Sequence, residues 1–298
     1  MSPLNCISCG GSRHKTLYHG PIRAGTPGME TKEHHEVVAC ENCGLTRLKE
    51  FPLSDDYYNS PEYREAYNGT AAVEDYLKTH DPEQTQRFAR IGMERFRGAV
   101  TLDYGCGGGS FLDLVKGAAA HTCGIEPFQG FHNDLKARGH AVFPSAEQAL
   151  EEMRGKCDVV VSFGVIEHVP DPLAYLRNVK DLLRPGGQLF LETDNLGDVL
   201  MRLRLDEFDR FFYRTAHFWY FTGETLGALT AKAGLTTSEL GYRHTYDLSN
   251  ALLWMRDRKP TGLGRLQLFS AEQDRAWRQG LEANGMADLI WLHAATRG

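Results

Sequence analysis

The chain has 298 residues, of which 42% are hydrophobic and 24% charged, and these fractions are typical of soluble globular proteins. No stretch approaches the ~18–20 uncharged apolar residues of a membrane-spanning helix, so we expect no membrane span. The formal net charge is −6, and residues 51–250 carry 20 basic against 29 acidic side chains. We expect no nucleic-acid partner, because nucleic acids are bound mainly through Lys and Arg.

Two Cys-x-x-Cys-Gly units stand within the first fifty residues. Their cysteines are Cys6, Cys9, Cys40 and Cys43. A two-residue spacer lets both sulfurs of a pair reach one ion, and the Gly that follows permits a tight turn. Four thiolates predict a closed, structural zinc site, although His14, His34 and His35 are possible substitute ligands. We therefore predict a zinc-binding module over residues 1–50, with a hairpin between the two pairs.

The first residues lack both a positively charged leader and an apolar stretch, so we expect a cytoplasmic protein in which disulfides are rare. Residues 51–98 are polar and aromatic, which indicates a linker followed by a lead-in helix. The helix is predicted to begin with Asp81 as its cap and Pro82 at its first position.

From residue 99 onward, short apolar runs alternate with helical periodicity, which predicts an α/β domain over residues 99–298. The fold class is a Rossmann-like, doubly wound parallel sheet. Predicted strands are 99–105, 121–127, 140–145, 157–164 and 187–195, and predicted helices are 110–117, 128–138, 146–154 and 171–183. A Pro-Gly-Gly turn at 185–187 is expected to start the fifth strand. Residues 196–221 form an insertion, a helix runs from Thr222 to about Ala233, and the remainder completes the sheet with a helix at about 271–284.

A glycine-rich loop follows the first predicted strand of this domain and opens a helix. It reads Asp-Tyr-Gly-Cys-Gly-Gly-Gly-Ser from Asp103, with glycines at 105, 107, 108 and 109. Several glycines let the backbone lie directly against a ligand. Asp103 beside the loop favours a cationic ligand over a diphosphate. Glu126 ends the next strand 19 residues after Gly107, where an acid accepts both hydroxyls of a ribose. The pattern predicts a site for adenosine that carries a positive group.

These motifs resemble those of class I S-adenosylmethionine-dependent methyltransferases over residues 80–235. The segments are DYGCGGGSFL, GIEP, SAE at 145–147, VVVSFGVIEHVPDP and LRPGGQLFLET. The resemblance implies that S-adenosylmethionine is the cofactor. It places Asp103, Gly105 and Gly107 at the methionine part, Glu126 at the ribose, Pro127, Phe128, Ser145 and Ala146 around the adenine, and Phe163 and Gly164 under the cofactor. The family often has Asp where Ser145 stands, which leaves the adenine amino group to the backbone or to Glu147.

The paired cysteines, a Tyr-rich stretch at 57–67 and this core together resemble bacterial enzymes that methylate nucleotide-activated or glycan sugars. In sugar C-methyltransferases of that type a Glu-His pair follows the fifth strand, whereas here Ala216 precedes His217. The missing carboxylate favours O-methylation over carbon methylation. We predict O-methylation of a sugar, nucleotide-sugar or glycan-type small molecule.

His217 and His168 are the two candidates for the base that takes the hydroxyl proton, because the pKa of histidine suits this task near neutrality. A magnesium-assisted mechanism is an alternative, since Glu192, Asp194 and Asn195 cluster at the end of the fifth strand. Three other functions stay open: a sugar C-methyltransferase, an rRNA methyltransferase with a zinc ribbon, and a non-catalytic zinc-ribbon scaffold on a methyltransferase fold.

Overall fold

The computed structural model describes residues 5–53, 55–68, 72–262 and 266–298. Contacts group the chain into two compact units. Unit 1 comprises Met1–Leu53, Glu192–Leu229 and Glu239–Trp291, and unit 2 comprises Ser54–Leu191, Thr230–Ser238 and Leu292–Gly298.

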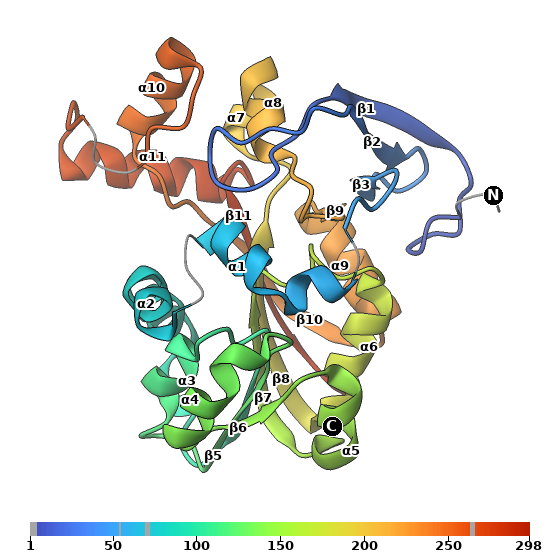
Figure 1. Cartoon of the computed structure of the whole chain (residues 1–298), viewed down its shortest axis with the longest axis vertical. Coiled ribbons are helices and arrows are strands. Elements are labelled where there is room, and N and C mark those ends of the chain that lie inside the picture. The colour runs from blue at the N-terminus through green and yellow to red at the C-terminus, as the bar shows by residue number, and fades with distance from the viewer. Residues whose placement is uncertain (1–4, 54, 69–71, 263–265) are drawn as a thin grey trace. The chain divides into compact units, whose positions relative to one another are not determined.

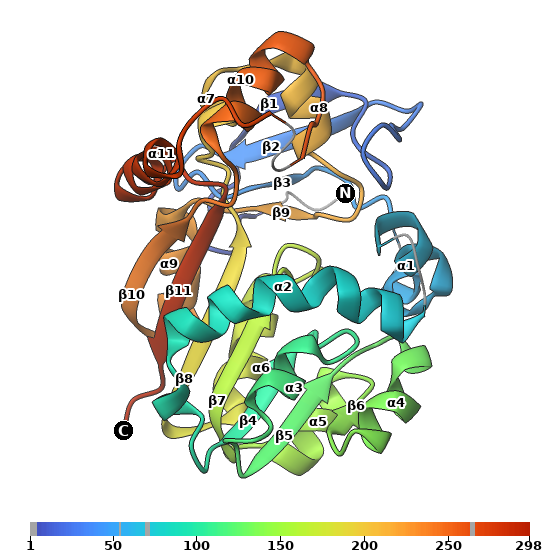
Figure 2. The ribbon, with the colours of Figure 1, turned by 90° about the vertical axis from the view of Figure 1, so that its left-hand side faces the viewer.

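Unit 2 contains a parallel sheet with helices on both of its faces. Its elements are η1 (Asp55–Asn59), α1 (Pro61–Asn68), α2 (Val73–Ile91), η2 (Met93–Arg95), β4 (Val100–Tyr104), α3 (Ser110–Val115), β5 (His121–Ile125), η3 (Gln129–Phe131), α4 (His132–Ala137), β6 (Ala141–Phe143), α5 (Ala146–Met153), β7 (Cys157–Phe163) and α6 (Pro172–Leu182). Leu102 in β4 lies beside Cys123 of β5 and Val160 of β7, and both pairings are parallel. Helices α2, α3 and α4 cover one face of the sheet, and α5 and α6 cover the other (Figures 1 and 2).

Four further elements have residues in both units, namely β8 (Leu183–Asp194), α9 (Gly223–Lys232), β10 (Thr236–Arg243) and β11 (Leu289–Ala295). The strand order of the sheet is β10-β11-β8-β7-β4-β5-β6. Strand β11 runs antiparallel to β8, because the Thr296 amide donates to the Gly187 carbonyl while the Asn195 amide donates to the Asp288 carbonyl. The predicted α/β fold and the five predicted strands are confirmed.

Two predicted element boundaries are wrong. Helix α2 begins at Val73, so Pro82 lies inside it and Asp81 does not cap it. The proline is tolerated because it faces solvent, while the inward face of α2, which includes the buried Gln84 and Ile91, packs on α3. Strand β8 begins at Leu183, so the Pro-Gly-Gly segment belongs to the strand and does not precede it.

Unit 1 joins the N-terminal residues to the predicted insertion. Its own elements are β1 (His14–Gly20), β2 (His35–Cys40), β3 (Thr46–Leu48), α7 (Val199–Arg202), α8 (Asp206–Phe212), β9 (Trp219–Tyr220), α10 (Leu248–Asp257) and α11 (Ala271–Ala283). The sheet order is β1-β2-β3-β9, and Arg47 of β3 pairs with Trp219 of β9. This grouping differs from the predicted domain limits at residues 50 and 98, because β9 pairs with the free edge of the N-terminal hairpin sheet.

The core of unit 1 is an aromatic and aliphatic cluster. It contains Ile22, Val37, Leu48, Phe208, Phe212, Tyr220 and Trp254 among its buried members. The predicted helices after Thr222 and around 271–284 are confirmed as α9 and α11, and α11 begins with a capping box between Ser270 and Gln273. Among the described residues, no helix combines the length and the apolar character that crossing a membrane requires.

Replacing Leu48 by Ala tests the shared core of the hairpin and the insertion. Leu48 is 0% exposed in the cluster of unit 1, so we expect the change to lower the free energy of unfolding by ~2–5 kcal/mol. Urea unfolding followed by tryptophan fluorescence measures the loss. Leu203→Ala is the control, because Leu203 is 45% exposed and its truncation should cost less than ~0.5 kcal/mol. Equal losses from the two variants would contradict this core.

Candidate functional site

A cavity of about 440 Å³ in unit 2 opens beside the carboxyl ends of β4, β5 and β7. Ligands of open α/β sheets bind at this edge. Of the residues predicted to bind the cofactor, six line it: Gly105, Glu126, Pro127, Ser145, Ala146 and Gly164. His168 also lines the cavity, whereas Asp103, Gly107, Phe128 and Phe163 lie outside its lining. The structure thus gathers most of the predicted set around one cavity.

The glycine loop between β4 and α3 is anchored to the neighbouring strand. The amides of Gly105 and Cys106 both donate to the carbonyl of Ile125, at 2.8 and 3.1 Å. Gly105 and Gly107 have φ angles of +85° and +53°, which favour glycine. A Cβ atom on Gly107 would lie 2.0 Å from the hydroxyl oxygen of Tyr76 in α2. A side chain at this position would therefore displace Tyr76.

Glu126 is the most heavily bonded acid of this cavity, and it is 1% exposed. Its Oε2 accepts from the Gly107 amide at 2.8 Å, and its Oε1 accepts from the Phe128 amide at 2.7 Å. The guanidinium of Arg64 in α1 donates to the same Oε1 at 2.6 Å. Each carboxylate oxygen offers about two acceptor positions. Two donors therefore occupy Oε1, and Oε2 keeps one position for a further donor.

Asp103 lies beneath the loop at the end of β4 and is 4% exposed. Burial raises the pKa of this carboxyl to about 7, Glu126 adds to the rise, and Arg87 of α2 opposes it. Desolvation disfavours the charged form of an acid, and a nearby cation restores it. Asp103 is therefore an acid that a positively charged ligand would ionise.

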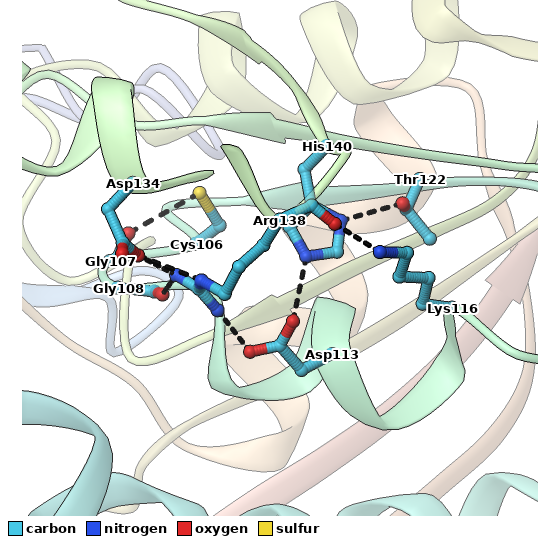
Figure 3. Close-up of polar contacts among 9 residues, drawn as sticks. All are labelled: Cys106, Gly107, Gly108, Asp113, Lys116, Thr122, Asp134, Arg138 and His140. Carbon is cyan, nitrogen blue, oxygen red and sulfur yellow. Dashed lines mark hydrogen bonds and ion pairs between the residues drawn. The ribbon is translucent and has the colours of Figure 1, made fainter. Parts of the chain in front are cut away.

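The outer side of the loop is held by an arginine at the end of α4 (Figure 3). Arg138 donates to the carbonyl of Gly108, to Asp113 of α3 and to Asp134. His140 contacts the other oxygen of Asp113 at 2.9 Å and the hydroxyl of Thr122 at 2.7 Å. This network fixes the loop to α3 and α4, which keeps its backbone in place for a ligand.

The other end of the cavity is framed by aromatic and polar side chains. Ser145 caps α5 by accepting from the amide of Gln148 at 3.4 Å, and Glu147 also lines the cavity. The ring of His168 lies 5.5 Å from that of Tyr58, measured between centroids. Beside the cavity, the guanidinium of Arg87 lies 4.6 Å from the centre of the Phe163 ring.

Sequence reasoning missed Arg64, Tyr76 and Arg87, which contact the predicted site residues from α1 and α2. Tyr76, His80, Gln84 and Arg87 recur at helical spacing and lie on one face of α2. That periodicity begins before Pro82. It was the available signal that the helix starts early and presents polar groups to the glycine loop.

His217, the other predicted base, belongs to unit 1 and is 4% exposed. Its Nδ1 lies 3.4 Å from Oδ2 of Asp194, which also accepts from Arg214 at 2.7 Å. Burial raises the pKa of Asp194, while Arg214 and Arg23 oppose the rise. The carboxylate of Asp194 thus lies within ion-pair distance of the imidazole of His217.

The three residues that suggested a magnesium site form hydrogen bonds or ion pairs with other protein groups. Glu192 holds Arg243 through both of its oxygens, at 2.7 and 2.9 Å. The side-chain amide of Asn195 donates to the backbone carbonyls of Gly285 and Ala287. These bonds and the ion pair of Asp194 account for the three residues as parts of the fold.

The four cysteines of the N-terminal pairs converge in unit 1, with all four sulfur atoms within 4.8 Å of one another. The hairpin of β1 and β2 fills the gap between the pairs, as predicted. Gly10 and Gly44 have φ angles of +77° and +76°, and their amides close turns onto the carbonyls of Cys6 and Cys40. Burial would raise the pKa of Cys40, but the amides of Cys43 and Asn42 outweigh it and lower this pKa to about 7. The cluster is compatible with one tetrahedrally bound metal ion.

Comparison with known proteins gives three kinds of match. Residues 76–240, more than half of the chain, match the model of a family described as a methyltransferase domain. A ubiquinone biosynthesis O-methyltransferase of Ruegeria pomeroyi is 35% identical over 159 residues, which cover 49% of this chain and 63% of the relative. The enzyme of the same name from Pseudomonas paraeruginosa is 38% identical over 107 residues, covering 33% of this chain and 45% of the relative. Less than two thirds of each relative is therefore matched.

Two solved structures share the fold. A SAM-dependent methyltransferase from Archaeoglobus fulgidus superposes with a TM-score of 0.51 at 16% identity, covering 79% of this chain and 98% of the other. A chain from the complex of the Haloferax volcanii Trm112 methyltransferase activator with a putative methyltransferase gives 0.50 at 12% identity, covering 76% and 98%. At these identities the matches establish the fold alone.

Asp103→Asn tests the buried acid. Its pKa of about 7 lies above the ordinary value of 3.8, so the folded chain holds a proton that the unfolded chain releases between about pH 4 and 7. Asp103 therefore destabilises the fold increasingly as pH rises through this window, and fully above it. At pH 8 we expect the free energy of unfolding of the variant to exceed that of the wild type by up to ~4 kcal/mol, so the variant should melt at a higher temperature. Near pH 4 the two proteins should melt at the same temperature. Calorimetry at both values measures this, and a difference independent of pH would contradict it.

Proposed function

Because the chain belongs to the family of class I S-adenosylmethionine-dependent methyltransferases, we propose that it transfers a methyl group from S-adenosylmethionine to a hydroxyl of a small, sugar-like acceptor. The main support for S-adenosylmethionine as the cofactor is Glu126, which is buried at the end of β5 and hydrogen-bonded to the glycine loop. Oxygen as the acceptor atom is supported by the names of the matched relatives and by Ala216, which stands where sugar C-methyltransferases carry Glu. The sugar class rests on the sequence resemblance.

Glu126 accepts the two ribose hydroxyls in this proposal. Two hydroxyls need two acceptor positions, and only one is left while Arg64 holds Oε1. Cofactor binding therefore releases Arg64 from Glu126. The guanidinium remains among the rings of Tyr76, Phe128 and Phe131, each within 6 Å of it, so the cation keeps favourable partners.

The positive sulfonium and ammonium groups of the cofactor match the acid beneath the loop. Asp103 is neutral about half the time near pH 7, and a cation beside it shifts it to the charged form. The amides of the loop around Gly105 and Gly107 are held in place by Ile125 and Arg138. A preformed loop lowers the entropy lost on binding.

The adenine lies at the other end of the cavity. Pro127, Ser145 and Ala146 line this end, and Glu147 is an acceptor for the adenine amino group in place of the Asp that the family often has. Gly164 lines the cavity and would lie under the cofactor, as the sequence resemblance implies. His168 shapes the same cavity and acts mainly on cofactor binding.

Methyl transfer is an in-line displacement in which the acceptor oxygen bonds to the methyl carbon as the carbon–sulfur bond breaks. The sulfur takes the electron pair and leaves as neutral S-adenosylhomocysteine, and the hydroxyl proton must go to a base. His217 is that base, with Asp194 beside Nδ1 to orient the ring and to stabilise the imidazolium. Holding the oxygen ~3–3.5 Å from the methyl carbon supplies much of the rate enhancement.

His217→Ala tests this assignment. We expect turnover to fall by ~10²–10⁴-fold while cofactor affinity stays nearly unchanged, because a general base acts on the proton and not on the cofactor. A coupled assay that releases homocysteine, run with nucleotide sugars, free sugars and RNA, measures turnover.

Two matched variants complete this test. Glu126→Ala should weaken cofactor binding, and His168→Ala should change both cofactor affinity and rate. The reverse pattern for the two histidines would transfer the role of base to His168. Activity on RNA alone, with a steep loss as salt rises, would replace the small-molecule acceptor by a nucleic acid.

We also propose that Cys6, Cys9, Cys40 and Cys43 hold one structural zinc ion. Zinc binds four thiolates tetrahedrally, and such a closed site leaves no position for a reacting water. The ion would tie the start of β1 to the end of β2. Zinc binding would therefore stabilise unit 1 and take no part in methyl transfer.

Cys40→Ser should reduce the zinc content from one equivalent to none and lower the melting temperature, since removing one ligand opens the site. Elemental analysis and thermal unfolding measure the two effects. Cys123→Ser is the control, because Cys123 is an isolated buried thiol in β5 of unit 2. A full equivalent of zinc in Cys40→Ser would refute the assignment.

A further inference from the structure

We propose that a second cavity, formed within unit 1 alone, binds the hydroxylated ring of the methyl acceptor. It measures about 300 Å³ and lies between the segment after β8, helix α8, and the chain around β10 and α10. This inference rests on the proposed function and names the site and the chemical class of its acceptor.

The apolar wall consists of aromatic rings that hold one another in place. Phe208 and Phe211 of α8 lie 5.0 and 5.1 Å from Trp254 of α10, measured between ring centroids. Phe208 and Trp254 are buried in the core of unit 1. The wall is thus rigid before a ligand arrives. A flat ligand ring with an apolar face would bury that face against it.

The polar groups of the cavity include both a donor and an acceptor with capacity to spare. Asp198 is 4% exposed, and in the part of the chain that the structure describes only its Oδ1 forms a hydrogen bond, with the Leu200 amide. Arg214 donates to Asp194 through its terminal nitrogen, while its buried Nε has no partner among the described residues. A ligand that both donates and accepts hydrogen bonds suits this pair, and hydroxyl groups do both.

The acids that line the cavity outnumber its one arginine, which argues against an anionic ligand. Asp194 is paired with Arg214, and Oδ1 of Asp288 accepts from the backbone amide of Thr245 at 2.8 Å. Burial raises the pKa of Asp198 to about 7, so this acid is often neutral. Asp247 caps α10 through the Asn250 amide. A phosphate would meet four carboxyl groups here, whereas a neutral polyol brings no charge to them and can donate to their oxygens.

The size and the position of the cavity also favour a single ring as its ligand. Its volume is at the lower end of the range of ligand pockets, which fits one ring better than an extended chain. Asp194 lines the cavity, and its Oδ2 lies 3.4 Å from Nδ1 of His217. A hydroxyl of the bound ring would therefore be close to the carboxylate that orients the proposed base.

Calorimetric titration of the full chain without cofactor tests the inference. The probes are the methyl glycosides of glucose, galactose and mannose, with phenol and cyclohexanol as apolar rings of similar size. We expect at least one glycoside to bind saturably and more tightly than either control. Asp198→Asn should weaken this binding tenfold or more, because a hydroxyl that donates to Asp198 favours its carboxylate form, and an amide is a poorer acceptor than a carboxylate. Asn also caps helices well, so α7 should persist in the variant.

Two further variants keep the result interpretable. Trp254→Leu should weaken glycoside binding by removing the stacking face, while Asp209→Asn, a change to an acid of α8 outside the cavity lining, should leave it unchanged. Binding of phenol or cyclohexanol in preference to every glycoside would overturn the inference, and so would equal glycoside affinity in wild type and Asp198→Asn. Separate titration with S-adenosylmethionine distinguishes the two proposals. Glycoside binding without cofactor binding would contradict the proposed methyl transfer but would still support the polyol site.

Discussion

The cavity of unit 2 depends on the buried carboxylate of Glu126. This carboxylate joins the end of β5, the turn at Phe128, the glycine loop and α1 through hydrogen bonds of 2.6–2.8 Å. A carboxylate that is 1% exposed is stable only while donors surround it. Arg64 supplies a guanidinium for this purpose, and the ribose of the proposed cofactor would supply two hydroxyls. The same demand for donors thus holds the cavity in shape and favours a ligand that brings hydroxyl groups.

Each unit also contains a buried acid whose pKa is raised to about 7, namely Asp103 in unit 2 and Asp198 in unit 1. In both cases burial is the main cause, and other acids nearby add to it. Such acids destabilise the free protein near neutral pH, so their presence indicates a role other than stability. Their partners differ: Asp103 lies near Arg87 and beneath a loop that suits a cation, whereas Asp198 caps a short helix beside aromatic rings.

The N-terminal cysteine module and the insertion form one structure in unit 1. Strand β9 of the insertion extends the hairpin sheet, and Leu48 of β3 packs in the same cluster as Phe208 and Trp254. A metal ion that orders the hairpin would therefore also support α8 and α10, whose rings line the second cavity. The module is thus coupled to the proposed acceptor site through packing, even though its cysteines do not reach that cavity.

Local patterns in the sequence determined the strands of the parallel sheet, the glycine loop with Glu126, and the two cysteine pairs, because each depends on residues that are close along the chain. Alternating apolar runs and the positions of glycines directly indicate the local conformation of the backbone. The start of α2 was misjudged for the opposite reason, since Pro82 is a local signal that packing on α3 overrides. Only the tertiary structure decided that Arg64 binds Glu126, 62 residues away, that β9 pairs with β3, and that Asp194 lies beside His217. Side chains on different elements come into contact only when the whole chain packs. The spacing of residues along the sequence does not indicate which of these side chains will be close in space.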